Sequence, residues 1–180
     1  MDMRLAVGVT AFSVVILSLP ALGQQWSDYI NPEYRFRVNF PAEPTEQDAV
    51  YVSADGSSHA ARGFSSEQDA GRFRVLVVQF PSGLADLAGE FDHAAEAYRQ
   101  LGEVVYDQAG EYEDIAAYEI NVIGPDGRQI YVSFAYHDRR LFIAEGSVGA
   151  DSFPPIQFQQ SLWITDAAGA PINGGRRLGN

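Results

Sequence analysis

Residues 145–149, which read Glu-Gly-Ser-Val-Gly, come nearest to a catalytic motif in this sequence. They differ from the Gly-x-Ser-x-Gly nucleophile elbow at its first position, where Glu145 stands in place of glycine. The elbow also requires a strand, a sharp turn and a helix in succession, and no strong helical pattern follows Gly149. The segment therefore favours a glycine-rich loop after a strand, and we predict no catalytic residue.

The three histidines, His59, His93 and His137, do not form a recognisable metal-binding or catalytic motif. No two of them have the spacing of metal ligands. His93 falls beside an expected apolar stripe, which indicates the surface of a helix, and the other two lie near expected turns, where exposure is the rule. Distant residues can still meet in space, but no pattern points to a triad. We expect no cofactor and no metal.

Acidic side chains crowd one expected turn at Glu111, Glu113 and Asp114, with Asp107 nearby. Calcium and similar cations take several oxygen ligands, so the cluster is a formal candidate site. The glycine and spacing of an EF-hand loop are missing. A solvated acidic turn is favoured, and whether it binds a cation stays open.

A second expected turn carries two adjacent arginines, Arg139 and Arg140, beside His137 and Tyr136. Arginine and tyrosine are enriched at the centres of protein interfaces. We therefore predict these four residues as a partner-binding tip. The alternative is a structural turn, because tight turns need polar residues such as Asp138 and neighbouring strand residues point to opposite faces.

The composition excludes several classes of chemistry. The chain has no cysteine, and its twelve basic residues are all arginine. Thiol nucleophiles, disulfides, lipidated cysteines and lysine Schiff bases are therefore impossible. The formal net charge is −12, which repels nucleic acid and anionic membranes, since binding there requires neutralising phosphates.

The first 23 residues have the pattern of a cleavable export signal. Arg4 supplies a positive start, residues 5–19 carry no charge, and Pro20 precedes the small-residue site Ala21-Leu22-Gly23. A transmembrane anchor is the alternative, but a spanning helix needs about 20 apolar residues. We predict a signal peptide at residues 1–23, a periplasmic or secreted location, and no membrane span after cleavage.

Alternating and turn residues predict a succession of strands. Residues 35–40 alternate between apolar and polar, residues 72–80 are apolar on both faces, and Asp55-Gly56 predicts a hairpin turn. Strands are expected at residues 35–40, 49–54, 58–65, 72–80, 103–108, 115–123, 128–137 and 141–147. Strands joined by tight turns pair antiparallel.

One long helix is expected after residues 81–83, with Ser82 as its N-cap and Gly102 after its end. Its apolar stripe predicts that Leu87, Phe91 and Tyr98 pack on the sheet. The same stripe leaves Glu90 and Glu96 in solvent.

A shorter helix is expected over residues 151–161, and residues 162–164 close the fold. Residues 24–165 are therefore predicted to form a single α+β domain, with an antiparallel β-sheet sandwiched between helices. The glycine-rich residues 166–180 have little apolar content and are predicted to be a disordered tail.

Several segments resemble the PsbP-like family, which shares its fold with the nuclear import factor Mog. The first is Trp26-x-x-Tyr29, followed by Tyr-Arg-Phe-Arg-Val-Asn-Phe-Pro-Ala-Glu-Pro at residues 34–44. Exported bacterial members often begin with a similar F-x-V-x-F-P-x-x-P strand. Residues 158–162, Phe-Gln-Gln-Ser-Leu, fit the family's closing F-x-x-S-F/L. The resemblance spans residues 26–164.

This resemblance implies an α/β/α sandwich and a non-enzymatic role. PsbP proteins of plants assist photosystem II, and Mog binds a small GTPase, but no functional residue can be carried over. We therefore expect an exported, non-enzymatic binding or accessory module whose partner is an unknown protein or small molecule of the envelope. It could assist an envelope protein complex.

Two alternatives stay open. One is a small exported enzyme, hydrolase-like, in an NTF-like α+β cone. The other is a structural or envelope-assembly protein. A pocket in which a carboxylate and a histidine converge would favour the enzyme.

The signal pattern gives the first testable prediction. The intact mass of the exported protein is expected to match a chain that starts at Gln24. A protein that stays in the cytoplasm and retains Met1 would contradict this prediction.

Overall fold

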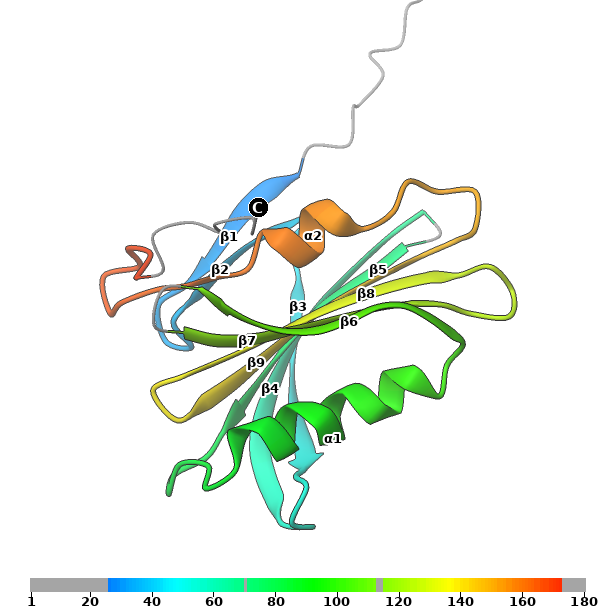
Figure 1. Ribbon diagram of the computed structural model, residues 1–180. Helices are drawn as coiled ribbons and strands as arrows, with labels where there is room; N and C mark the ends of the chain where they lie inside the picture. The colour runs from blue at the N-terminus through cyan, green and yellow to red at the C-terminus, as the bar shows by residue number, and fades with distance from the viewer. Residues whose placement is uncertain (1–25, 70, 113–114, 173–180) are drawn as a thin grey trace, which may run out of the picture.

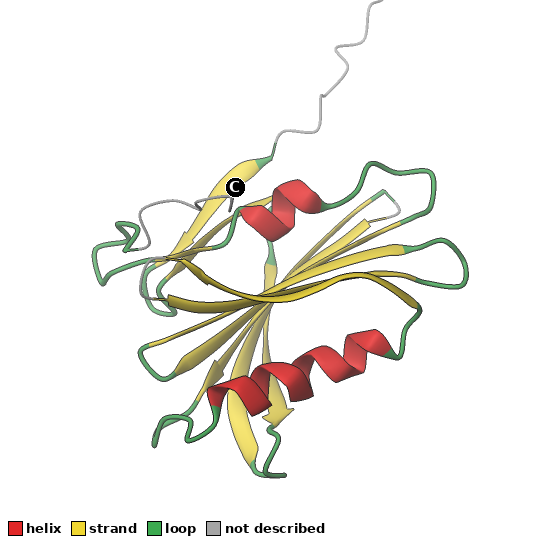
Figure 2. Cartoon of the chain, in the orientation of Figure 1, coloured by secondary structure: helices red, strands yellow, loops and turns green. Residues whose placement is uncertain are grey.

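The structure, a computed structural model, describes residues 26–69, 71–112 and 115–172. The predicted signal peptide lies outside these residues. The described residues form ten strands and two helices, shown in Figures 1 and 2. In chain order they are β1 (Ser27–Asn31), β2 (Phe36–Phe40), β3 (Thr45–Val52), β4 (Ser58–Gln68), β5 (Gly71–Gln79), α1 (Leu87–Arg99), β6 (Glu103–Tyr112), β7 (Ile115–Ile123), β8 (Gln129–His137), β9 (Arg140–Val148), α2 (Ile156–Gln160) and β10 (Trp163–Ile164).

Seven strands form one antiparallel sheet in the order β3-β4-β5-β9-β8-β7-β6. Tight turns set most of these pairings. Between β8 and β9 the turn residues Asp138 and Arg139 both have positive φ, 46° and 60°, which matches the twist of a two-residue hairpin. Gly56, with φ 82°, lies in the turn between β3 and β4. The predicted hairpin at residues 55–56 is confirmed.

Each face of this large sheet packs against a different layer. On β5, Phe73, Val75 and Val77 point to one face, and Val78, with Leu76 partly buried, points to the other. The first face is covered by α2 and by a separate sheet of three strands, β1-β2-β10. The second face is covered by α1 (Figure 1).

The predicted α+β sandwich, with the sheet between helices, is wrong. The chain is mostly β, and a second antiparallel sheet does most of the covering that a helical layer was expected to do. Phe36, Val38 and Phe40 of β2 are fully buried there against the large sheet. The sequence predicted the β2 strand, but its local alternation carries no information on which sheet it joins.

The long helix α1 begins later than the sequence predicted. Asp86, and not Ser82, is the N-cap, because its side chain accepts a hydrogen bond of 2.9 Å from the Gly89 amide. The helix ends at Arg99 with Gln100 as C-cap. The interval from residue 81 to residue 86 is instead a connection that runs from β5 to the helix.

The prediction that Glu90 is solvated is also wrong. Glu90 is buried, and its carboxylate accepts hydrogen bonds from the Tyr51 hydroxyl at 2.6 Å and the Ala54 amide at 3.2 Å. The apolar stripe of α1 does not reveal that β3 passes beside the first turn. Glu96 is exposed, as predicted, and Phe91 packs in the core.

Residues 166–172 form a hydrogen-bonded turn, although the sequence predicted that a disordered tail starts at residue 166. The Asp166 amide donates to the Ala170 carbonyl at 2.8 Å, and the Ile172 amide returns to Ile164 of β10 at 2.9 Å. Residues 173–180 lie outside the described part of the chain.

The packing of α1 gives a stability prediction. Phe91 is 4% exposed, and its ring lies 6.1 Å from that of Tyr118 and 6.3 Å from that of Phe134, measured between centroids. The change Phe91→Ala is expected to lower the free energy of unfolding by about 3–5 kcal/mol, because it leaves a cavity. Chemical denaturation measures the effect. Phe153→Ala is the control, since Phe153 is 96% exposed and its loss should cost less than about 0.5 kcal/mol.

Candidate functional site

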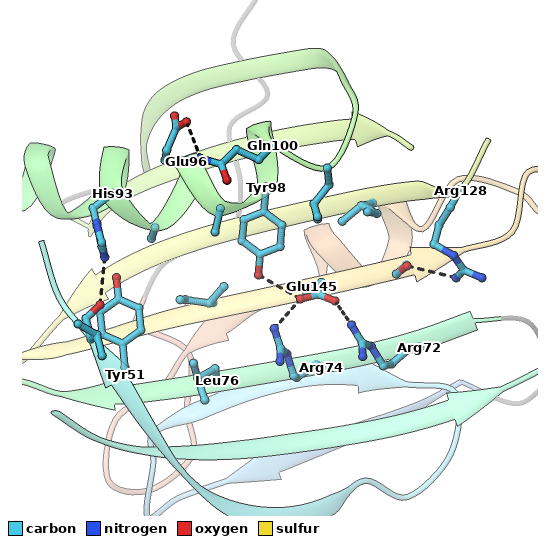
Figure 3. A pocket seen from close by; sticks show the side chains of 17 residues that line it. Tyr51, Arg72, Arg74, Leu76, His93, Glu96, Tyr98, Gln100, Arg128 and Glu145 are labelled. Atoms are coloured by element: carbon cyan, nitrogen blue, oxygen red, sulfur yellow. Dashed lines mark hydrogen bonds and ion pairs between the residues drawn. The ribbon is translucent and has the colours of Figure 1, made fainter. Parts of the chain in front are cut away.

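A cavity of about 720 Å³ lies between α1 and the centre of the large sheet. Its floor comes mainly from β5, β8 and β9, and its roof comes from α1 (Figure 3). The cavity has an arginine-rich end, an apolar middle and an end beside Tyr51 and His93. Clefts of this size commonly hold small molecules in proteins.

The arginine-rich end is organised around Glu145, which is 4% exposed. On β9 the side chains that face α1 are Leu141, Ile143, Glu145 and Ser147, so a carboxylate follows two apolar residues in this row. β5 supplies its partners, because Arg74 lies opposite Glu145 in the strand register and Arg72 lies one step further along the same face.

Three side chains donate to this buried carboxylate. Arg72 Nη2 lies 3.0 Å from Glu145 Oε1, and Arg74 Nη2 lies 2.6 Å from Oε2. The Tyr98 hydroxyl, which reaches down from α1, donates to the same Oε2 at 3.0 Å (Figure 3). The cluster therefore joins the helix to two neighbouring strands of the sheet.

The pKa values of the donors are consistent with these roles. Burial, followed by the charge of Glu145, raises the pKa of Tyr98 well above its usual range, so the hydroxyl stays protonated. Burial alone would lower the pKa of Arg74, but interactions with Glu145 and Tyr98 outweigh it and raise that pKa. The cluster is thus a carboxylate compensated by guanidinium groups and not a proton-transfer pair.

At the opposite end of the cavity, His93 and Tyr51 make contacts of their own. One ring nitrogen of His93, Nε2, lies 3.0 Å from the Val52 carbonyl oxygen, and the Tyr51 hydroxyl donates to Glu90. Among the hydrogen bonds of the described residues, none joins His93 to Glu145. A histidine and a carboxylate share this cavity, but they are not arranged as an acid–base pair.

Polar contacts hold both ends of the helical roof. Near the last turn of α1, Arg99 Nε donates to Asp107 of β6 at 2.8 Å, and its Nη2 donates to the Tyr118 hydroxyl at 2.8 Å. Hydrogen bonds from Arg99 lower the pKa of Asp107, with burial opposing them and Tyr118 adding to them. The Glu90–Tyr51 bond holds the first turn. The cavity therefore has a roof tied at each end.

The four residues predicted as a partner-binding tip do not gather into one surface. Tyr136 packs beneath α1, and its hydroxyl accepts a hydrogen bond of 3.2 Å from the Leu84 amide. Arg139 Nη1 donates to the Pro81 carbonyl at 3.0 Å. Arg140 forms an ion pair with Asp138 at 3.6 Å, and His137 is paired with Arg140 in the strand register. Two of the four thus brace the connection between β5 and α1.

Residues 145–148 belong to strand β9 (Arg140–Val148), as the strand predicted at residues 141–147 implies, so the glycine-rich loop favoured for residues 145–149 begins only at Gly149. Ser147 is buried and paired in the ladder, and α2 begins only at Ile156, so no nucleophile elbow forms. Gly146 is needed for packing, because a Cβ there would lie 2.8 Å from Pro155 Cβ.

Glu145 was not among the site residues predicted from the sequence. A signal was present, since this charged residue follows Leu141 and Ile143 at an inward position of a predicted strand.

The acidic turn is only partly described. Glu111 is exposed on β6, whereas Glu113 and Asp114 lie outside the described residues. Within the described ranges, no group of three His, Asp or Glu side chains is placed to hold a metal ion. No helix in those ranges is long and apolar enough to cross a membrane.

Comparison with known proteins gives no family. No protein-family model matches the chain. A search of curated proteins likewise finds no match.

The Glu145 cluster yields a second stability prediction. Glu145→Gln is expected to lower the free energy of unfolding by about 1–3 kcal/mol, because Arg74 and Arg72 lose the carboxylate that compensates them. The partial exposure of both arginines keeps the cost below that of a fully buried pair. Glu96→Gln removes the same charge from an exposed position on α1 and should change stability by less than about 0.5 kcal/mol. Equal effects of the two changes in urea denaturation would contradict the role given to Glu145.

Proposed function

We propose that the protein is an exported, non-enzymatic binding module, and that the cavity beneath α1 is its ligand-binding site. The observation that carries the proposal is the cavity itself, which combines an apolar middle with a few converging polar groups. Leu76, Ala94, Ile130 and Ile143 contribute apolar surface, and Glu145 with its partners marks one end. Small-molecule sites in proteins usually combine these two features.

Two further points support a binding role over an enzymatic one. The buried carboxylate is engaged by two arginines and a tyrosine, and the cavity histidine contacts a backbone carbonyl. Neither group is positioned to act on the other. The resemblance of residues 26–44 and 158–162 to PsbP-like proteins points the same way, since the roles known in that family are accessory ones.

Export belongs to the same proposal. It rests on the signal pattern of residues 1–23, with Arg4 before an uncharged segment and small residues at 21–23. A ligand of the envelope or of the surroundings, or an envelope protein complex that the module assists, would then be the natural partner.

A neutral apolar dye tests the cavity. N-phenyl-1-naphthylamine fluoresces strongly when it leaves water, and it is expected to bind the mature protein with one saturable site. Ala97→Trp should abolish this signal, because Ala97 is exposed on α1 and lines the cavity, so the indole fills the space.

Ala88→Trp is the matched control, since Ala88 is exposed on the same helix and is not among the cavity-lining residues. It should bind the dye as the unmodified protein does. Equal binding by Ala97→Trp and Ala88→Trp, or no binding by the unmodified protein, would overturn the proposed site.

A further inference from the structure

The lining of the cavity differs in charge from the rest of the chain. The formal net charge of the protein is −12. Three arginines, Arg72, Arg74 and Arg128, line the cavity together with two glutamates, Glu96 and Glu145. By the same formal count, in which histidine carries no charge, this lining carries one net positive charge. A positive end inside an acidic protein selects for an anion and against a cation.

The two outer arginines are placed to meet a ligand. Arg72 has a side chain that is 53% exposed, and it gives a single hydrogen bond, from Nη2 to Glu145, among the described residues. A guanidinium carries five N–H groups, so most of its donors still face the cavity and solvent. Arg128 reaches the same end from the turn before β8, and its Nη1 lies 3.3 Å from Ser147 Oγ. Ser147 is the register partner of Arg72.

Nearby carboxylates do not cancel this field. Asp126 lies 3.9 Å from Arg128 Nε, at the limit of an ion pair, and its side chain is exposed. Glu67 and Asp69 border an adjoining hollow that Arg72, Arg128 and Ser147 also line, and Glu67 is exposed. Water screens these exposed carboxylates, as it screens Arg72 and Arg128, whose side chains are 53% and 40% exposed. The preference for an anion therefore rests on the hydrogen-bond donors that Arg72 presents toward the cavity.

We propose that the ligand is an amphipathic monoanionic acid, such as a carboxylate or a sulfonate on an apolar chain or ring. Its acid group lies against Arg72 and Arg128, and its apolar body lies beneath α1 over Leu76, Ile130 and Ile143. One net positive charge matches one negative charge. A dianionic phosphate ester would leave excess negative charge beside Glu145. Arginine forks bind carboxylate and sulfonate oxygens in pairs, which fixes the orientation of the ligand. This inference rests on the cavity being the binding site.

A pair of dyes tests the anionic ligand separately from the binding cavity. 8-Anilinonaphthalene-1-sulfonate has the same rings as N-phenyl-1-naphthylamine and adds one sulfonate. The sulfonate dye is expected to bind the mature protein at least about tenfold more tightly, which corresponds to one charge-assisted contact. The net charge of −12 on the whole chain disfavours binding of an anionic dye. A preference for the sulfonate dye would therefore have to come from the residues that line the cavity.

The variant Arg72→Gln with Arg128→Gln tests the location of the anion. It leaves Arg74 in place to compensate Glu145, and circular dichroism verifies that the fold is retained. The double change is expected to remove the tenfold preference while the neutral dye binds as before. Arg62→Gln is the control for the loss of an arginine charge elsewhere, because Arg62 lies on the opposite face of the sheet, where it pairs with Glu46 and Asp48.

Each result has a defined meaning. If the neutral dye binds the cavity as tightly as the sulfonate dye, the proposed site stands and the anionic ligand is overturned. If the double variant keeps the preference, or if Arg62→Gln loses it equally, the arginine site is overturned. If neither dye binds, the proposed function and this inference both fall.

Discussion

A carboxylate buried in an apolar row is the constraint on which the rest of this site depends. Glu145 occupies the face of β9 that packs against α1, and a charge in that position must be compensated. The neighbouring strand does so with Arg74 and Arg72, and the helix adds Tyr98. The side chains of Arg72 and Arg74 are long and partly exposed, so they do not fill the space between the sheet and α1 as leucine would. The helix packs on the core through Phe91 and Ala95 and borders the cavity through His93, Ala97 and Tyr98.

The parts of the fold that local patterns encode could be predicted from the sequence. Strand β7 has the predicted bounds, and the turns at residues 55–56 and 138–139 follow from their residue types. The covering layer could not be predicted in this way. β1 has little alternation, and the assignment of β2 to a second sheet depends on contact with β10, more than 120 residues later in the chain. The residues of one strand do not show which distant strand it pairs with.

The candidate site could not be predicted from the sequence for a related reason. Polar residues in turns often belong to binding sites, which is why Arg139 and Arg140 were predicted, but these side chains contact Pro81 and Asp138. The informative residues were polar ones at positions where the pattern calls for apolar ones. Glu145 on β9 is of this kind, and Glu90 on α1, although off the predicted apolar stripe, is likewise buried with hydrogen-bond partners. Their partners come from other elements, which a single sequence does not connect.

The three-stranded sheet has a consequence for how the chain matures. β2 lies between β1, which directly precedes it, and β10, which is the last of the described strands. Until Trp163 and Ile164 have been synthesised, one edge of β2 has open backbone groups, and the aromatic layer around Phe36 lacks part of its cover. Open strand edges pair readily with other chains. A chain that lacks residues 163 and 164 is therefore expected to aggregate more readily than the full chain.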